Sequence, residues 1–289
     1  MTQHLAIPVA PGNKIDLSKI DPDDKRGLDR EQGDKAFENL GARLGVLQEL
    51  LYAAKQHAVL VVLQGLDTSG KDGTIRHVMS SVSPQGVEVE SFKVPTAEEL
   101  AHDFLWRAHR VVPAKGILTI FNRSYYEDVL VVRVHELAPK TVWQARYDQI
   151  NAFESLLTAT NTIVVKFYLH ISKDEQRKRL LARENDKDKA WKLSAADWVE
   201  RRSWDSYTQA YQDALQRCST PEAPWYIVPA DHKWYRNLVI ATTLVHVLEA
   251  HEAAWRRQLE ELGRQELQAI RESRQRVDAA KESPGSARR

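Results

Sequence analysis

The chain has 289 residues, of which 43% are hydrophobic and 28% charged, a composition typical of an α/β domain with a large core. Its 41 Lys and Arg residues nearly balance 40 Asp and Glu residues, which excludes the global charge excess that recruits nucleic acid. The single Cys218 excludes an intrachain disulfide, no apolar run approaches the roughly 20 residues of a membrane span, and the polar N-terminus lacks the apolar core of a signal peptide. We therefore expect a cytoplasmic protein without a nucleic-acid or membrane partner.

The first 33 residues are rich in Pro, Asp, Lys and Gly and show no sustained period, so we expect them to form an extended arm. A folded domain is expected from residue 34 to about 262. Its first element is predicted to be an amphipathic helix, because apolar residues recur at helical spacing. These residues are Phe37, Leu40, Leu44, Leu47, Leu50 and Leu51.

Residues 59–75, VLVVLQGLDTSGKDGTI, join an apolar run to a glycine-bounded loop and a segment that can be helical. This order predicts a buried strand, a phosphate loop and a helix, and the segment GLDTSGK at 65–71 fits the GxxxxGK half of a P-loop. Glycines let the backbone approach an anion, the helix N-terminus presents N–H groups, and Lys71 adds a full charge. The predicted phosphate-binding residues are Gly65, Thr68, Ser69, Gly70, Lys71, Asp72 and Gly73.

Two carboxylates accompany this loop. Asp67 lies inside it, and Asp72 stands where P-loop NTPases have Ser or Thr on Mg²⁺. Because carboxylates repel polyphosphate unless a cation lies between them, Asp67 and Asp72 predict a site for Mg²⁺, or for a similar hard ion such as Mn²⁺. Asp72 could instead complement the positive end of the helix that follows.

Two strands and a helix are predicted next. Residues 86–92 alternate like a strand, and Thr96 with acids behind it predicts a helix over about 97–110. Residues 116–121 form the next buried strand, and a polar cluster follows at 122–128. Since catalytic groups in open α/β sheets gather at the carboxyl ends of strands, this cluster is expected beside the P-loop.

Within this cluster, Asn122 stands where the common P-loop layout has an Asp that holds Mg²⁺. The charge of the metal is therefore expected to fall on Asp67, and the possible helpers are Asp72, Glu127 and Asp128. Arg123 is placed to steady a transferring phosphate by a bidentate contact, although a structural salt bridge is the alternative.

A helix over about 140–159 leads to a strand at 162–169, and a fifth strand is predicted at 223–231, before a helix over 234–262. Strands that alternate with helices in this way predict a parallel five-stranded sheet with helices on both faces. The last residues, 263–289, carry 7 Lys or Arg and 4 Asp or Glu, and we expect them to form a flexible charged tail.

Between these last two strands, Arg179 and Arg183 stand four residues apart and share one helix face. An arginine-bearing helix that closes over phosphates is one interpretation. A solvated face, balanced by neighbouring acids, is the other. The aromatic residues Trp191, Trp198 and Trp204 could stack a base, but their helical spacing favours packing.

Taken together, these segments resemble the polyphosphate kinase 2 family. The resemblance covers about residues 35–250, in the family's order: GLDTSGKDG (65–73), FKVPT (92–96), FLWRAH (104–109), FNRSYYEDVLVVRVH (121–135), SKDEQ…R (172–183), WKLS…D…R…WD.Y..AY (191–211) and APWYIVPAD.KWYRN (223–237). It implies a three-layer αβα P-loop kinase fold, similar to thymidylate kinase, with a helical lid at about 172–215.

The same resemblance implies Mg²⁺-dependent, reversible phosphoryl transfer between inorganic polyphosphate and nucleotides. Asp67, Lys71 and Asp72 would serve metal and phosphates, Arg123 the transferring group, and Arg179 and Arg183 the lid. The sequence FNRS before YYEDV is similar to the subgroup (class III) that phosphorylates both nucleoside mono- and diphosphates. Adenine nucleotides are the expected acceptors, guanine nucleotides are a second candidate, and a homodimer or homotetramer is expected.

Two other functions fit parts of the pattern. An ATP-dependent nucleotide kinase would use ATP and show no turnover with polyphosphate alone. A nucleotide-responsive regulatory ATPase would change conformation on binding nucleotide and phosphorylate no acceptor.

Overall fold

The computed structural model describes residues 5–185 and 195–282. They build a mixed α/β fold around a six-stranded sheet with the order β1-β6-β5-β2-β4-β3. The five longer strands are parallel, as predicted, and β1 pairs antiparallel with β6 at one edge. The strands are β1 (Ile7–Pro8), β2 (Ala58–Gln64), β3 (Val87–Ser91), β4 (Leu118–Asn122), β5 (Thr162–His170) and β6 (Trp225–Pro229).

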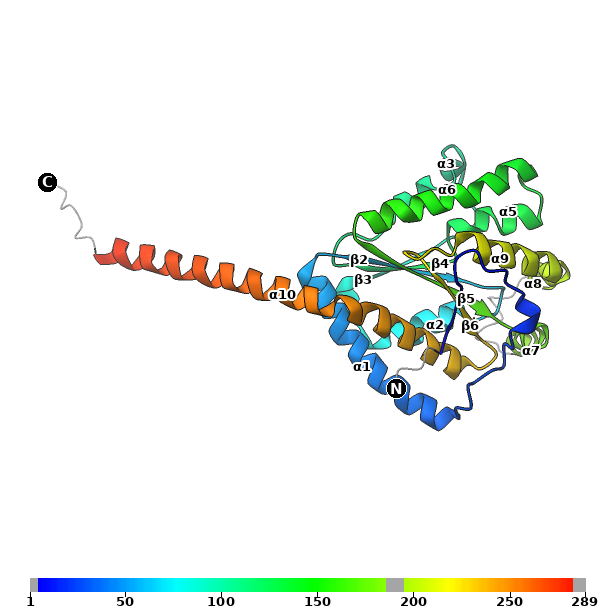
Figure 1. Cartoon of the computed structure of the whole chain (residues 1–289), viewed down its shortest axis with the longest axis horizontal. Helices are drawn as coiled ribbons and strands as arrows, with labels where there is room; N and C mark the ends of the chain where they lie inside the picture. Colours follow the sequence, from blue (N-terminus) through cyan, green and yellow to red (C-terminus); the bar gives the residue numbers. More distant parts are fainter. Residues whose placement is uncertain (1–4, 186–194, 283–289) are drawn as a thin grey trace.

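Helices cover both faces of the sheet, which gives the three layers seen in Figure 1. One layer contains α1 and α10 beside α2, and the other contains α6 and α9. The helices are α1 (Arg30–Ala54), α2 (Lys71–Val78), α3 (Ala97–Leu100), α4 (Trp106–His109), α5 (Val131–Val134), α6 (Lys140–Ala159), α7 (Lys173–Glu184), α8 (Ala195–Glu200), α9 (Trp204–Cys218) and α10 (Lys233–Glu282).

Strand β2 shows how the sequence divides the core. All seven of its side chains are buried, because β4 and β5 flank it and helices lie above and below. Successive side chains of a strand point to opposite faces, so Val59 and Val61 pack in the cluster with α1 and α10. Leu60 and Val62 pack in the cluster with α6 and α9. A continuous apolar run is typical of such a doubly covered parallel strand.

The sheet has one strand more than the predicted five. Ile7 and Pro8 pair with Ile227 and Tyr226, so part of the expected extended arm completes the edge of the sheet beyond β6. A two-residue strand carries no period that could indicate it. The end of the arm is set by a capping box, in which Asp29 accepts a hydrogen bond from the Gln32 backbone, and α1 begins at Arg30.

Two helices differ from their predicted lengths. The helix expected over 97–110 is two short helices, α3 and α4, because the Asp103 side chain accepts a hydrogen bond from the Leu105 backbone and competes with helix propagation. Helix α10 continues past the expected end at 262 to Glu282 and projects away from the sheet (Figure 1). Gly263 does not end it, and contacts from Glu261 to Arg264 and Gln265 bridge the position. Residues 283–289 of the expected tail lie outside the described residues.

None of the described helices combines the length and the apolarity that crossing a bilayer requires.

Candidate active site

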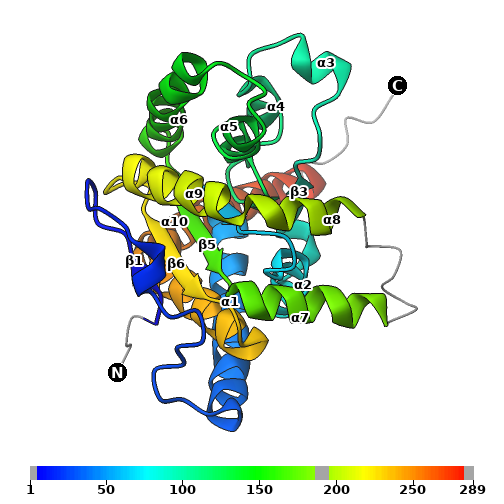
Figure 2. The same cartoon turned by 90° about the vertical axis from the view of Figure 1, so that its right-hand side faces the viewer.

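A pocket opens at the carboxyl ends of the parallel strands, the edge of the sheet that faces the viewer in Figure 2. The P-loop after β2, the polar turn after β4 and the helices α7, α8 and α9 enclose it. Its lining residues are Gly65, Leu66, Asp67, Arg123, Glu127, Val131, Gln176, Glu200, Arg201, Trp204, Tyr207 and Tyr211. The structure thus brings together the P-loop and the polar cluster, which the sequence placed side by side.

The P-loop needs glycine at both ends. Gly65 has a φ of 154° and Gly70 a φ of 106°, values that L side chains rarely adopt. A Cβ on Gly65 would lie 2.9 Å from the Leu169 carbonyl oxygen, so the loop also packs closely against β5. Thr68, with a φ of 64°, holds a left-handed conformation without being glycine, and such strain is concentrated at functional sites.

Three hydroxyl groups around the loop are buried without a hydrogen-bond partner in the described part of the chain. They belong to Thr68, Ser69 and Thr74. A buried polar atom without a partner costs stability, and most native structures avoid it. These hydroxyls, together with the N–H groups at the start of α2, therefore indicate a site built to meet oxygen atoms of a ligand.

Lys71 is buried and folds back into the loop. Its Nζ donates to the carbonyl oxygens of Gly65 at 2.6 Å and Leu66 at 3.4 Å. Burial, helped by the nearby charge of Arg123, lowers the pKa of Lys71 to about 8, although Asp67 and other acids oppose the shift. A bound anion would add to the negative charge that these acids already place near the ammonium group.

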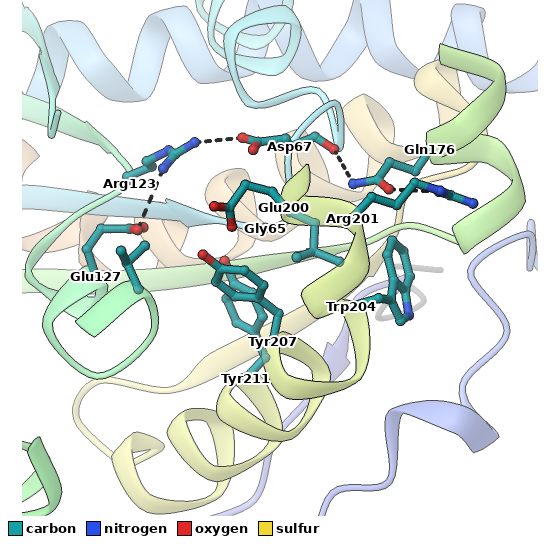
Figure 3. A pocket seen from close by; sticks show the side chains of 12 residues that line it. Gly65, Asp67, Arg123, Glu127, Gln176, Glu200, Arg201, Trp204, Tyr207 and Tyr211 are labelled. Carbon is teal, nitrogen blue, oxygen red and sulfur yellow. Dashed lines mark hydrogen bonds and ion pairs between the residues drawn. The ribbon is translucent and has the colours of Figure 1, made fainter. Parts of the chain in front are cut away.

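Arg123 lies between two carboxylates, as Figure 3 shows. Its Nη2 donates to Asp67 Oδ1 at 2.6 Å, and its Nη1 lies 3.7 Å from Glu127 Oε2. Burial raises the pKa of Glu127, and Arg123 and Lys71 oppose that shift. The salt bridge that the sequence offered as the alternative role of Arg123 is therefore present. It joins the polar turn after β4 to the P-loop.

The turn that carries Arg123 and Glu127 rests on a buried charge network. Lys166 Nζ donates to Glu154 Oε2 at 2.5 Å and to the Tyr126 hydroxyl at 3.0 Å. The hydroxyls of Tyr125 and Tyr126 both donate to Glu154 Oε1 at 2.8 Å. Fully satisfied buried networks fix the groups that they hold, so this one fixes the backbone between Arg123 and Glu127.

Asn122 and Asp128 differ in how they relate to the pocket. Asn122 Nδ2 donates to Asp72 Oδ1 at 2.8 Å and so orients that carboxylate beside the loop. Asp128, expected as a helper for the metal, does not line the pocket and pairs with Arg146 at 2.9 Å and with Arg107 at 3.8 Å. Burial raises the pKa of Asp128 to about 6 against the effect of these two arginines.

Arg179 does not face the pocket. Its Nε donates to Glu175, its Nη1 to the carbonyl oxygens of Thr68 and Ser69, and its Nη2 to those of Ala230 and Asp231, at distances of 2.7–3.1 Å. All parts of the guanidinium are thus engaged in joining α7 to the P-loop and to the end of β6, in place of the expected phosphate contact. Arg183, one turn further along α7, is half-buried and does not line the pocket either.

Helices α8 and α9 and the 3₁₀ turn between them (Arg201–Ser203) contribute residues that were not among the predicted site residues. Arg201 Nη1 donates to Gln176 Oε1 at 2.9 Å, and Gln176 in turn donates to the Asp67 carbonyl oxygen at 3.1 Å (Figure 3). Trp204 and Tyr207 also line the pocket. Their helical spacing could have indicated a shared face, but not whether that face covers a core or a cavity. Residues 186–194 of the expected lid, including Trp191, lie outside the described residues.

No group of three or more His, Cys, Asp or Glu side chains within 5–185 and 195–282 could hold a metal ion by itself. Magnesium sites in kinases, however, use one or two carboxylates and complete their shell with phosphate oxygens and water. Asp67, inside the loop, and Asp72, directly after Lys71, are carboxylates of the kind that such a site uses.

Comparisons with known proteins identify the family. The model of the family described as Polyphosphate kinase 2 (PPK2) matches residues 27–256. The chain belongs to the polyphosphate kinase 2 family. Its AMP/ADP-polyphosphate phosphotransferase relative from Meiothermus ruber is 52% identical over 243 residues, which are 83% of this chain and 91% of that protein. The ADP-polyphosphate phosphotransferase of Rhodopseudomonas palustris is 46% identical over 84% of this chain and 88% of its own.

Solved structures of polyphosphate kinase 2 proteins agree with this membership. The crystal structure of polyphosphate kinase 2 from Arthrobacter aurescens superposes with a TM-score of 0.81, at 43% identity, over 84% of this chain and 88% of that one. The family match includes the P-loop, the polar turn after β4 and helices α7 to α9. It ends at residue 256, so the projecting part of α10 lies beyond it.

Proposed function

We propose that this family member transfers the terminal phosphate of inorganic polyphosphate to AMP and ADP, reversibly and with Mg²⁺, to give ADP and ATP. The observation that carries the proposal is the loop at 65–73 with its surroundings. Buried Lys71 lies in this loop, Arg123 pairs with its Asp67, and the hydroxyls of Thr68, Ser69 and Thr74 are buried without a partner in the described part of the chain. The AMP/ADP-polyphosphate phosphotransferase that is 52% identical over 243 residues supports this choice of donor and acceptors.

The reaction requires no nucleophilic side chain. The acceptor's phosphate oxygen attacks the terminal phosphorus in line, and the shortened polyphosphate leaves, so catalysis consists of positioning and of stabilising charge. Lys71 and the loop N–H groups hold phosphate oxygens, and Arg123 moves part of its pairing from Asp67 to the transferring group. Within the same proposal, Arg183 and Arg201 are the cations of the lid.

Asp67 and Asp72 would hold Mg²⁺, or Mn²⁺ in its place, and this ion would offset the repulsion between the two phosphate chains. Asn122 keeps Asp72 oriented and cannot itself neutralise the ion.

One assay tests the proposal. The protein is mixed with Mg²⁺, long-chain polyphosphate and either ADP or AMP, without ATP, and ATP is measured. We expect ATP from ADP at once, and ADP followed by ATP from AMP. If this mixture gives no ATP, but AMP is phosphorylated when ATP replaces polyphosphate in a parallel mixture, the protein would instead be a nucleotide kinase. Nucleotide binding without a phosphorylated acceptor would indicate a regulatory ATPase.

Glu127→Gln should change the choice of acceptor. The substitution removes a negative charge beside Arg123, so repulsion of the more highly charged ADP falls more than repulsion of AMP. We expect the ratio of kcat/KM for ADP to that for AMP to rise about 3- to 10-fold, with an unchanged Mg²⁺ requirement. Glu49→Gln, on the exposed side of α1, is the matched control. An equal loss on both acceptors would assign Glu127 to the chemistry in general.

A further inference from the structure

Arg236, in the first turn of α10, lies against the P-loop but does not line the pocket. Only 2% of the residue is exposed. Its Nη1 donates to the Ser69 carbonyl oxygen at 3.1 Å, and its Nε and Nη2 donate to the side-chain oxygen of Asn237 at 3.2 and 2.9 Å. The guanidinium touches the loop so closely that a Cβ on Gly70 would lie 1.9 Å from Nη1, and one on Gly73 would lie 3.7 Å from Nη2.

No carboxylate compensates the charge of Arg236 among the ion pairs of the described residues. Its charged neighbour is a second cation, Arg179, which donates to the same Ser69 carbonyl oxygen and has Glu175 at 2.8 Å as its own counter-ion. Burial, together with Arg179, lowers the pKa of Arg236 to about 9. A buried cation in this setting lowers the stability of the protein without ligand, so packing alone does not explain it.

The surroundings of Arg236 indicate the role of its positive charge. The loop segment that it contacts carries the buried hydroxyl of Ser69 and precedes that of Thr74, both without partners in the described chain. The same segment forms the N-terminus of α2, whose N–H groups favour an anion. Inside a protein the field of a charge is screened far less than in water. The guanidinium group of Arg236, on one side of the loop, can therefore attract an anion that binds on the other side.

We propose that Arg236 is a positioning residue for the polyphosphate-binding loop: it fixes the Ser69–Gly70 turn, and its uncompensated charge strengthens the binding of the phosphate chain on the far side of that turn. This inference rests on the proposed function, because it assigns the anion to the P-loop. It adds a determinant of affinity that touches no substrate atom.

Two variants of similar size separate charge from hydrogen bonding. Arg236→Gln keeps a donor for the Ser69 carbonyl oxygen without the charge, whereas Arg236→Lys keeps both. The full chain is titrated with inorganic tripolyphosphate and Mg²⁺ by calorimetry, and thermal unfolding is recorded without ligand. Arg43→Gln, which breaks a pair with Glu249 and Glu252 between α1 and α10, is the control for loss of an arginine.

We expect Arg236→Gln to weaken tripolyphosphate binding about 10- to 100-fold, with an unchanged or higher midpoint of unfolding, because an unpaired buried charge is gone. Arg236→Lys should stay within about threefold of the wild type, and Arg43→Gln should bind normally. Equal affinity of the Gln variant and the wild type, or equal weakness of the Gln and Lys variants, would overturn the inference. A Gln variant that fails to fold would overturn it too, because the role of Arg236 would then be structural. Absence of binding to the wild type would instead contradict the proposed function.

Discussion

Lys71→Met is expected to lower kcat/KM with polyphosphate about 10³-fold for both AMP and ADP, while the protein stays folded. The ammonium group is buried and donates to two carbonyl oxygens of its own loop, so it is held at the place where phosphate oxygens would arrive. Methionine keeps the aliphatic stem and removes only the charge and the donors. Lys35→Met, on the exposed surface of α1, should retain full activity. Near-normal turnover of the Lys71 variant would remove this residue from the mechanism.

The pH profile offers a second measurement on Lys71. Because burial lowers the pKa of Lys71 to about 8, the charged form predominates below that pH in the protein without ligand. Polyphosphate binding should therefore weaken as the pH rises above about 8, and bound phosphate should move the decline to higher pH. In Lys71→Arg this alkaline decline should disappear, since guanidinium stays charged. An unchanged alkaline limb would assign the titration to another group.

Arg123→Met is expected to lower kcat/KM with polyphosphate about 10²- to 10³-fold, mainly through a lower kcat. The variant loses the group that would stabilise the transferring phosphate, and it leaves Asp67 and Glu127 with an unbalanced negative charge beside the P-loop. Added guanidinium ion should restore part of the activity if the loss is one of charge at this position. Arg110→Met, an exposed arginine that packs on Trp106, is the matched control. A change in KM alone would limit Arg123 to ground-state binding.

The sequence predicts those parts of the site that depend on neighbouring residues. The P-loop follows from a short apolar run, two glycines and Lys71, and its strand is buried on both faces as the run requires. The prediction that the polar turn lies beside the P-loop is confirmed. Strand β4 pairs with β2, so the carboxyl ends of both strands lie at one edge of the sheet.

The parts of the site that the sequence did not predict depend on contacts between residues that are distant in the sequence. Asp128 follows Glu127 directly, yet it pairs with Arg146 and Arg107 and does not line the pocket. The residues next to Asp128 in the sequence do not indicate these two partners. The sequence predicts a lid contact with phosphate for Arg179, but its guanidinium group donates to carbonyl oxygens of the loop and of the end of β6. No pattern in the sequence indicated the role of Arg236, because the sequence does not distinguish a buried arginine at the start of a helix from an exposed one.

Phosphorus NMR tests the central claim most directly. The wild-type protein is mixed with Mg²⁺, ADP and tripolyphosphate, without ATP, and the spectrum is followed in time. We predict that the signals of tripolyphosphate decline as those of the ATP γ-phosphate and of pyrophosphate grow in equal amounts, and that Lys71→Met leaves the mixture unchanged. Loss of tripolyphosphate with release of inorganic phosphate and no ATP, or ATP formation at equal rates by the Lys71 variant, would contradict the account.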